Sequence, residues 1–260
     1  MGSAALTKTI GERSPRSLAR MAGAFYFAAG LTGGFHQAFV LGRLVVNGNA
    51  AATASNITAH QSLFWLGFGA ALVSPACDMV KTVLFYDLFK PVNKRLSLIA
   101  MFFGIIGCAI QAVVSVFYIA PLVIVEGGQY LGVFKVEQLQ ALTLMFFKLT
   151  ARGIDIYLVF FGFYCVLIGY LIFRSIFLPR IIGLLMMFTG LGYSVLLHPP
   201  LAHHLYPYNL VPAALGETSL MLWLLVVGVN VQRWKQQAGA AVPLTLSQQS
   251  ASQSPVSIRA

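Results

Sequence analysis

The chain has 260 residues, of which 58% are hydrophobic and only 9% are charged. Soluble globular proteins carry about 25% charged residues, and a chain with so few cannot cover a water-exposed surface with polar groups. The composition therefore excludes most soluble folds and predicts an integral membrane protein. The net charge of +10 would suit nucleic-acid binding, so the distribution of charge along the chain has to be considered before that class is excluded.

Six apolar segments follow one another, and each is long enough to cross a hydrocarbon core of about 30 Å, which takes about 20 helical residues. Backbone polar groups in lipid have to be satisfied within their own segment, so the spans are helices and the fold class is all-α. Residues 1–17 and 236–260 are predicted to be flexible cytoplasmic tails around a membrane domain at 18–235. The predicted spans cover residues 18–41, 63–89, 96–125, 139–173, 181–197 and 211–233.

The basic residues between these spans predict the orientation of the chain. Twelve lie in the two tails and in the second–third and fourth–fifth loops, whereas only Arg43 and Lys135 lie on the other side. By the positive-inside rule, both termini are cytoplasmic. The cytoplasmic side accounts for the whole net charge of +10, because the outer and intramembrane charges each sum to zero. Nucleic-acid binding is therefore not expected, and anionic lipid head groups are the expected partners of the basic face.

Four stretches carry a resemblance to a known family. They read RMAGAFYFAAGL (20–31), FYDLFKPVNKRLSLIAMFFGIIGCAI (85–110), FFGFYCVLIGYLIFRSIFLPRIIGLLMMFTGLGYS (160–194) and ALGETSLMLWLLVVGV (214–229). Together they resemble the prokaryotic membrane family known as domain of unknown function 4386. The resemblance implies a multi-pass protein of a bacterial or archaeal membrane, with a bacterial inner membrane as the expected location, and it implies no particular activity.

Ionisable residues inside the predicted spans are costly in lipid and therefore indicate a function or an internal charge network. Three are basic and three are acidic. Their spacing puts Asp78 and Lys81 on one face of a helix, and it puts Lys148, Arg152 and Asp155 on one face of another. Both a structural network and a ligand site are consistent with this pattern. The six residues are Asp78, Lys81, Lys148, Arg152, Asp155 and Glu217.

Several polar residues fall at one predicted depth. Counted from the basic residues that anchor each span at the cytoplasmic face, they lie 16 to 19 residues away, which is about 24–29 Å along a helix. Arg152, beside them, is expected to pair with Asp155 or to hold an anionic group. The simplest interpretation is a polar chamber that opens outward. The residues at this level are His36, Gln111, Asp155, His198 and Glu217.

Proline and glycine residues within the spans give further expectations. Pro75 has no backbone N–H, so it should leave a carbonyl free about one turn from Asp78. The small-residue pair Gly30 and Gly34 is expected to pack against a neighbouring helix. Gly104 and Gly107 are expected to do the same in the third span.

The outer loop after the fifth span contains His198, His203 and His204. Together with His36 and Glu217 these residues suggest a metal site, but their spacing matches no established metal motif. Anchoring of the loop at the membrane interface is the alternative. No nucleotide or catalytic motif is present either, so we predict no cofactor.

Three functions remain open. The favoured one is a non-enzymatic membrane protein whose chamber binds or conducts a small or lipophilic molecule. The second is an intramembrane enzyme with Glu217 or Asp155 as general base and a metal bound by histidine. The third is a structural or assembly factor that uses small-residue helix faces. The oligomeric state cannot be predicted from these patterns.

Overall fold

A computed structural model of the chain describes residues 14–205 and 207–240. Within these residues every regular element is a helix, as predicted. The predictions for residues 1–13 and 241–260 lie outside the described part. The elements are α2 (Pro15–Gly34), which continues into η1 (Phe35–Leu41) and α3 (Gly42–Leu44), α4 (Ala50–Ala59), α5 (Gln61–Phe89), α6 (Lys94–Glu126), η2 (Gln129–Leu131), α7 (Val136–Arg174), α8 (Arg180–Ser194) with η3 (Val195–Leu197), α9 (Pro199–Leu205), η4 (Tyr208–Leu210), α10 (Val211–Val226) and α11 (Val231–Ala240).

Four described helical segments are long and apolar enough to cross a membrane: α5, α6, α7, and α8 together with η3. The pair α10 and α11, bent by 104°, makes a fifth if it is counted as one span. The first predicted span is helical over α2 and η1 but is not one of these candidates. The first turns of α2 carry Arg16 and Arg20, which lower its hydropathy.

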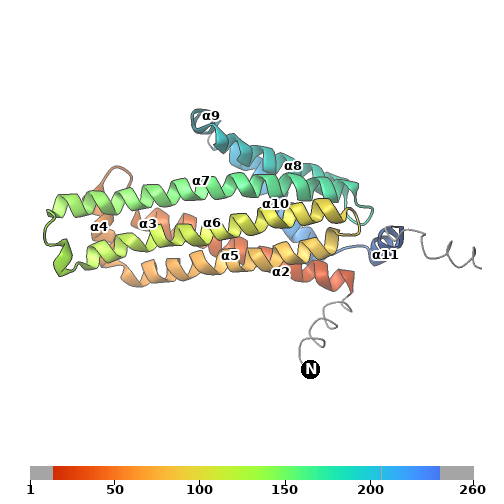
Figure 1. The fold of residues 1–260 in the computed structure, drawn as a ribbon, viewed down its shortest axis with the longest axis horizontal. Helices are drawn as coiled ribbons and strands as arrows, with labels where there is room; N and C mark the ends of the chain where they lie inside the picture. The colour runs from red at the N-terminus through yellow and green to blue at the C-terminus, as the bar shows by residue number, and fades with distance from the viewer. Residues whose placement is uncertain (1–13, 206, 241–260) are drawn as a thin grey trace, which may run out of the picture.

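The long helices lie side by side as a bundle (Figure 1), in which α7 packs against both α6 and α8, and α2 packs against α5 and α10. The 39 residues of α7 correspond to about 58 Å of helix, so α7 extends well past the shorter α8 (Figure 1). The small helix α4 packs on this far part of α7. The opposite end of the bundle, where α2 begins and α5 and α7 end, carries most of the basic residues, and we call it the basic end.

Two apolar clusters hold the bundle together. The larger lies toward the basic end and contains Leu88, Phe89, Leu171, Ile172 and Leu224, all fully buried. A second, smaller cluster lies toward the far end, where Ile57 of α4 and Phe64 of α5 meet Tyr118 of α6 and Phe147 of α7. In lipid, which is as apolar as these side chains, such clusters stabilise the bundle through close van der Waals packing and not through removal of apolar surface from water. Outside the clusters, large apolar side chains such as Leu66, Val116, Phe188 and Leu191 are exposed, as expected of a surface that faces lipid.

Glycines allow α7 and α8 to approach closely. A Cβ atom at Gly183 of α8 would lie 2.6 Å from the backbone nitrogen of Phe173 and 2.7 Å from the carbonyl oxygen of Gly169. Gly104 packs as predicted, since a Cβ there would touch Thr82. The prediction for Gly30 and Gly34 is wrong: nothing lies within 4 Å of a Cβ at either position, and both face a cavity instead of a neighbouring helix.

The break between α10 and α11 is built from specific contacts. Gly228 has a φ of +74°, a conformation that glycine adopts without strain. Asn230 then begins α11, since its Oδ1 accepts a hydrogen bond from the backbone N–H of Arg233. Trp234 donates its indole N–H to the carbonyl of Leu88 at 2.9 Å. These contacts dock α11 across the basic end of the bundle (Figure 1).

Candidate ligand chamber

A cavity of about 550 Å³ lies in the bundle between the two apolar clusters. Its wall is made by α2, η1, α5, α6, α7, α8 with η3, η4 and α10, so residues far apart in the sequence meet there. We call this cavity the chamber. Its volume falls in the range of about 300–1,000 Å³ that is typical of small-molecule sites. The polar residues in its wall include His36, Asp78, Gln111, Asp155, Asn209 and Glu217.

The structure brings together four of the five residues predicted at one level: His36, Gln111, Asp155 and Glu217 all line the chamber. His198 does not line it: this side chain is exposed between η3 and α9, where Nδ1 accepts a hydrogen bond from the backbone N–H of Leu201. The helix changes from α-helical to 3₁₀ geometry after Ser194 and ends at Leu197, so counting along one straight α-helix misplaces His198.

Glu217 of α10 is held by two tyrosines from different helices. Its Oε1 accepts a hydrogen bond from the Tyr193 hydroxyl at 2.6 Å, and its Oε2 accepts one from the Tyr26 hydroxyl at 3.2 Å. Gly216, which precedes Glu217, lies against Leu185 and Thr189 of α8 and so allows the close approach that this geometry needs. Both tyrosines also line the chamber.

Asp78 and Lys81 form the predicted ion pair within α5, with 2.5 Å between Lys81 Nζ and Asp78 Oδ1. The other carboxylate oxygen of Asp78 accepts a hydrogen bond from the Tyr157 hydroxyl at 3.5 Å. Lys81 is only 1% exposed, and its ammonium lies over the rings of Tyr26 and Phe161, 4.3 and 5.0 Å from their centroids. Asp78 thus faces the chamber, while Lys81 lies behind it in the core.

The proline of α5 is placed as predicted. Pro75 lies inside the helix, and its missing N–H leaves the carbonyl of Ala71, one turn earlier, without its usual donor. Ala71 lines the chamber. Ser74 does not donate to this carbonyl, because its hydroxyl donates to the carbonyl of Ala29 on α2 at 3.1 Å.

Two amide side chains in the wall have an unused acceptor. Gln111 Oε1 and Asn209 Oδ1 are buried and have no hydrogen-bond partner. Buried polar atoms without partners are uncommon in native proteins, and both of these belong to residues that line the chamber. His36, in contrast, is engaged: its Nδ1 lies 3.0 Å from the carbonyl oxygen of Gly67, and its ring packs edge-on against Tyr118.

Arg152 does not line the chamber but pairs with Asp155 across 3.1 Å, as the sequence suggested. Both residues line an adjoining groove of about 780 Å³ between α7 and the α8–α9 region. Asp155, Leu196 and Asn209 belong to the walls of both the chamber and this groove, so the two spaces adjoin. We call this groove the side groove. Lys148 lines another groove of about 350 Å³ beside η1, which also adjoins the chamber because both share Gln37, Thr150, Ala151 and Ile154.

The aromatic half of the chamber was missed by the sequence argument. Tyr26, Tyr118, Tyr157, Phe161 and Tyr193 all line it. The predicted polar level includes only ionisable and amide residues. The four tyrosines also indicate a polar site, because each hydroxyl inside a membrane span needs a hydrogen-bond partner.

The histidine loop is only partly described. His198 and His204 are exposed, and the side chain of His203 lies outside the described part. Among the described residues, no three His, Cys, Asp or Glu side chains are grouped closely enough to hold a metal ion.

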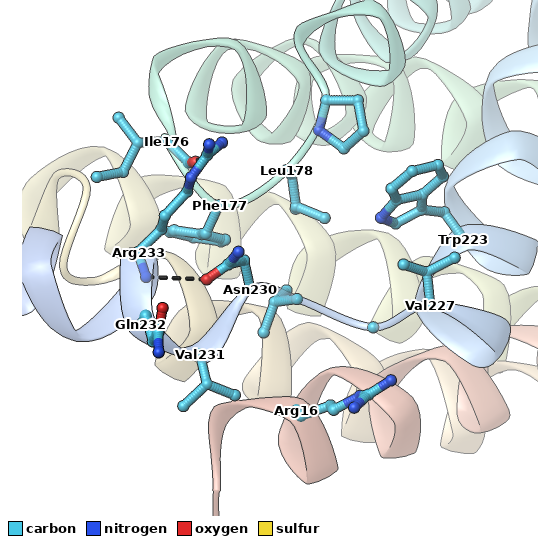
Figure 2. Close-up of a pocket in the computed structure, with 13 residues that line it drawn as sticks. Arg16, Ile176, Phe177, Leu178, Trp223, Val227, Asn230, Val231, Gln232 and Arg233 are labelled. Carbon is cyan, nitrogen blue, oxygen red and sulfur yellow. Dashed lines mark hydrogen bonds between the residues drawn. The ribbon is translucent and has the colours of Figure 1, made fainter.

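A second site lies at the basic end, where α10 breaks before α11 (Figure 2). Arg16 of α2 and Arg233 of α11 line this notch, and Trp223 contributes an apolar side. Arg233 donates through Nη1 to the carbonyl of Ile176 at 3.4 Å, and Arg20 donates to the carbonyl of Val226 at the end of α10. Cations at this position also complement the negative end of the α10 dipole.

The fold and chamber thus define a helical protein with several helices suited to a membrane and an internal polar cavity. The family described as "Domain of unknown function (DUF4386)" matches residues 21–228, and the chain belongs to this family. An uncharacterized protein of Archaeoglobus fulgidus is 24% identical over 152 residues, which make up 58% of this chain and 76% of the relative. No solved structure matches the chain.

Proposed function

We propose that the chain is a six-span protein of a bacterial inner membrane, with both termini cytoplasmic, whose chamber opens outward and binds or moves a small or lipophilic molecule. The observation that carries this proposal is the chamber itself, in which Asp78, Asp155 and Glu217 converge from three helices on one space of about 550 Å³. A purely structural charge network would fill such a space with partner side chains, because unpaired polar groups in lipid cost several kcal/mol.

The orientation is supported by where the helices begin and end. Arg16, Lys90, Lys94, Arg174 and Arg180 all lie at the basic end, in or beside the ends of α2, α5, α6, α7 and α8. A bundle of six alternating helices places them on one membrane face, which the positive-inside rule makes cytoplasmic. The larger apolar cluster lies between this face and the chamber. The smaller apolar cluster lies between the chamber and the far end. The apolar barrier is therefore larger on the cytoplasmic side, which favours access from the other face.

Anionic lipid head groups are the proposed partners of the basic end. Arg16 and Arg233 flank the notch at the α10–α11 break (Figure 2), and α11 lies across the bundle at 104° to α10. A helix at this angle is suited to the plane of the membrane surface, where basic residues attract anionic lipids.

The outward opening is tested by thiol labelling of intact cells. Gly34 lines the chamber and a Cβ there meets nothing within 4 Å, so Gly34→Cys should fold and react with a membrane-impermeant thiol reagent added outside. Gly69→Cys is the matched control, because Gly69 also has open space around it but is exposed on the outer surface of the bundle instead of in the chamber. Labelling of the parent chain, with Cys77, Cys108 and Cys165, gives the background.

Selective labelling of Gly34→Cys supports an outward-open chamber. If Gly34→Cys reacts no faster than Gly69→Cys, or reacts only after the cells are permeabilised, the chamber does not open outward and the proposed function is wrong.

A further inference from the structure

The charges around the chamber do not balance locally. Asp78 is paired with Lys81 at 2.5 Å, and Asp155 is paired with Arg152 at 3.1 Å. Among the described residues, no basic side chain lies within 4.0 Å of the Glu217 carboxylate, whose hydrogen-bond partners are the hydroxyls of Tyr193 and Tyr26. Glu217 is therefore the chamber carboxylate that has no ion-pair partner of its own, and the nearest positive charge, Lys81, is paired with Asp78.

The geometry of Glu217 leaves room for a ligand. A carboxylate offers about four lone-pair positions, and the two tyrosine hydroxyls occupy one on each oxygen. The remaining positions can accept hydrogen bonds from a donor inside the chamber. An alkylammonium carries up to three N–H donors and the missing positive charge.

The aromatic wall also favours a cation. The faces of aromatic rings attract ammonium groups within about 6 Å of the ring centroid. The protein already uses this interaction, since Lys81 Nζ lies over Tyr26 and Phe161. Tyr157 and Tyr193 line the chamber as well and do not take part in the contacts of Lys81 with aromatic rings.

The side groove adds an apolar compartment next to this site. Ile156, Val159, Phe160, Leu196 and Leu197 line it, and it adjoins the chamber at Asp155, Leu196 and Asn209. Asn209 is 9% exposed and its Oδ1 has no partner, so a free acceptor stands where the two spaces meet. A ligand that fills both spaces needs a polar, cationic head and an apolar tail.

We propose that the chamber binds an amphipathic ammonium, with its charged head between Glu217 and the tyrosine rings and its apolar tail in the side groove between α7 and the α8–α9 region. This assignment rests on the proposed function and specifies the chemical class of its ligand.

The sign of the electrostatic potential in the chamber is tested first, again with a cysteine at position 34. Gly34→Cys is treated with a cationic and with an anionic thiol reagent of similar size, and the ratio of the two rates is measured. Ser55→Cys gives the reference ratio, because Ser55 is exposed on α4 at the far end. We expect the ratio at Gly34→Cys to exceed the reference by about tenfold or more, and Glu217→Gln to bring it close to the reference. Glu137→Gln is the control, since Glu137 is exposed at the start of α7.

The ligand class is tested with three probes of equal tail length: octylamine, octanol and octanoate. Each is added to Gly34→Cys in nanodiscs, and protection from labelling is measured against concentration. We expect octylamine to protect best, with its apparent affinity lowered about tenfold or more by Glu217→Gln and unchanged by Glu137→Gln. Ala202→Phe, which narrows the side groove, should weaken protection by octylamine but leave labelling by the small cationic reagent intact.

The possible outcomes separate the two proposals. Equal protection by octanol, or better protection by octanoate, overturns the assignment of a cation and leaves a ligand-binding chamber. A reagent ratio equal to that at Ser55→Cys also overturns it. If Gly34→Cys is labelled but no probe protects it, the amphipathic ligand is wrong although the chamber is open. If Gly34→Cys is not labelled from outside, the proposed function is wrong, and the inference of a cationic ligand, which rests on it, is wrong as well.

Discussion

Two acids of the chamber, the buried Asp78 and the half-buried Glu217, are partnered in different ways. Asp78 has a lysine of its own helix at 2.5 Å, whereas Glu217 has only hydroxyl groups. Spacing along one helix predicts the first arrangement, because residues three apart share a face. No spacing rule predicts the second, because Tyr26, Tyr193 and Glu217 lie on three helices whose relative placement the sequence does not show.

This difference predicts a large loss of stability for a substitution at the first site and a smaller one at the second. Lys81→Met leaves Asp78 buried without its counter-charge, which should destabilise the protein by about 3–5 kcal/mol. Glu217→Gln keeps the shape of the side chain and removes a charge that has no ion-pair partner, but one of its two hydrogen bonds from tyrosine is lost or reversed, so its cost should be smaller, about 1–2 kcal/mol. Thermal unfolding in detergent, followed by circular dichroism, measures both changes.

A double replacement provides the check on that explanation. Asp78→Leu combined with Lys81→Met removes both charges, and apolar pairs in place of buried ion pairs are often neutral or stabilising. The double variant should therefore be more stable than Lys81→Met alone. If the double variant is less stable than Lys81→Met, the unpaired charge of Asp78 does not explain the loss of stability in Lys81→Met. The two side chains would then stabilise the fold by more than neutralising each other.

Among the elements, glycine positions divide into those that pack helices together and those that leave space. The sequence shows only that two small residues lie on one helix face, which is why Gly104 and Gly30 gave the same prediction. The structure separates them: Gly104 touches Thr82, while Gly30 faces the chamber. Whether a small residue meets a neighbour depends on the placement of the neighbouring helix, so part of the chamber wall was mistaken for a packing surface.

Alanine substitutions should reveal this division. Gly183→Ala places a Cβ 2.6 Å from a backbone nitrogen, so α7 and α8 have to move apart at a cost of about 1–3 kcal/mol or more. Gly30→Ala meets open space and replaces a poor helix former with a good one, for a gain of up to about 1 kcal/mol. Unfolding temperatures of the two variants should shift in opposite directions. Equal losses would show that Gly30 also packs against a partner.

The docking of α11 makes a second prediction for the elements. Trp234→Phe removes the hydrogen bond to the carbonyl of Leu88, worth about 0.5–1.5 kcal/mol, and should increase hydrogen exchange of the α11 amides while leaving α7 protected. Trp65→Phe is the control, because Trp65 is half-exposed at 49% on α5 and far from this joint. Unchanged exchange in α11 would mean that the helix is held by contacts other than Trp234.

For the whole molecule, composition and charge predicted an all-helical chain and the approximate position of each long helix. The lengths were less predictable. The fourth predicted span begins at residue 139, and its helix α7 begins at Val136 and runs unbroken to Arg174. The sixth, predicted over 211–233, is broken at Gly228 and turns by 104°. Hydropathy falls after Val229, where Asn230, Gln232 and Arg233 follow, but this fall does not show whether the helix ends, continues or bends.

The orientation of the molecule gives the last prediction. Ser55 on α4 lies at the far end and Gln236 on α11 lies at the basic end, and both are exposed. With cytoplasmic termini, Ser55→Cys should react with an impermeant thiol reagent in intact cells, whereas Gln236→Cys should react only after permeabilisation. The opposite pattern would reverse the protein in the membrane and turn the chamber toward the cytoplasm.

Labelling of both positions in intact cells would place Ser55 and Gln236 on one face of the membrane. An even number of crossings would then separate them, so one of α5, α6, α7, α8 and α10 would not cross completely. The shortest of these, α8 and α10, would be the first to suspect, since α8 has 15 residues and α10 has 16. Ser55 and Gln236 lie on opposite faces of the membrane only when an odd number of crossings separates them. Ser55→Cys and Gln236→Cys therefore test both the orientation of the protein and the number of its spans.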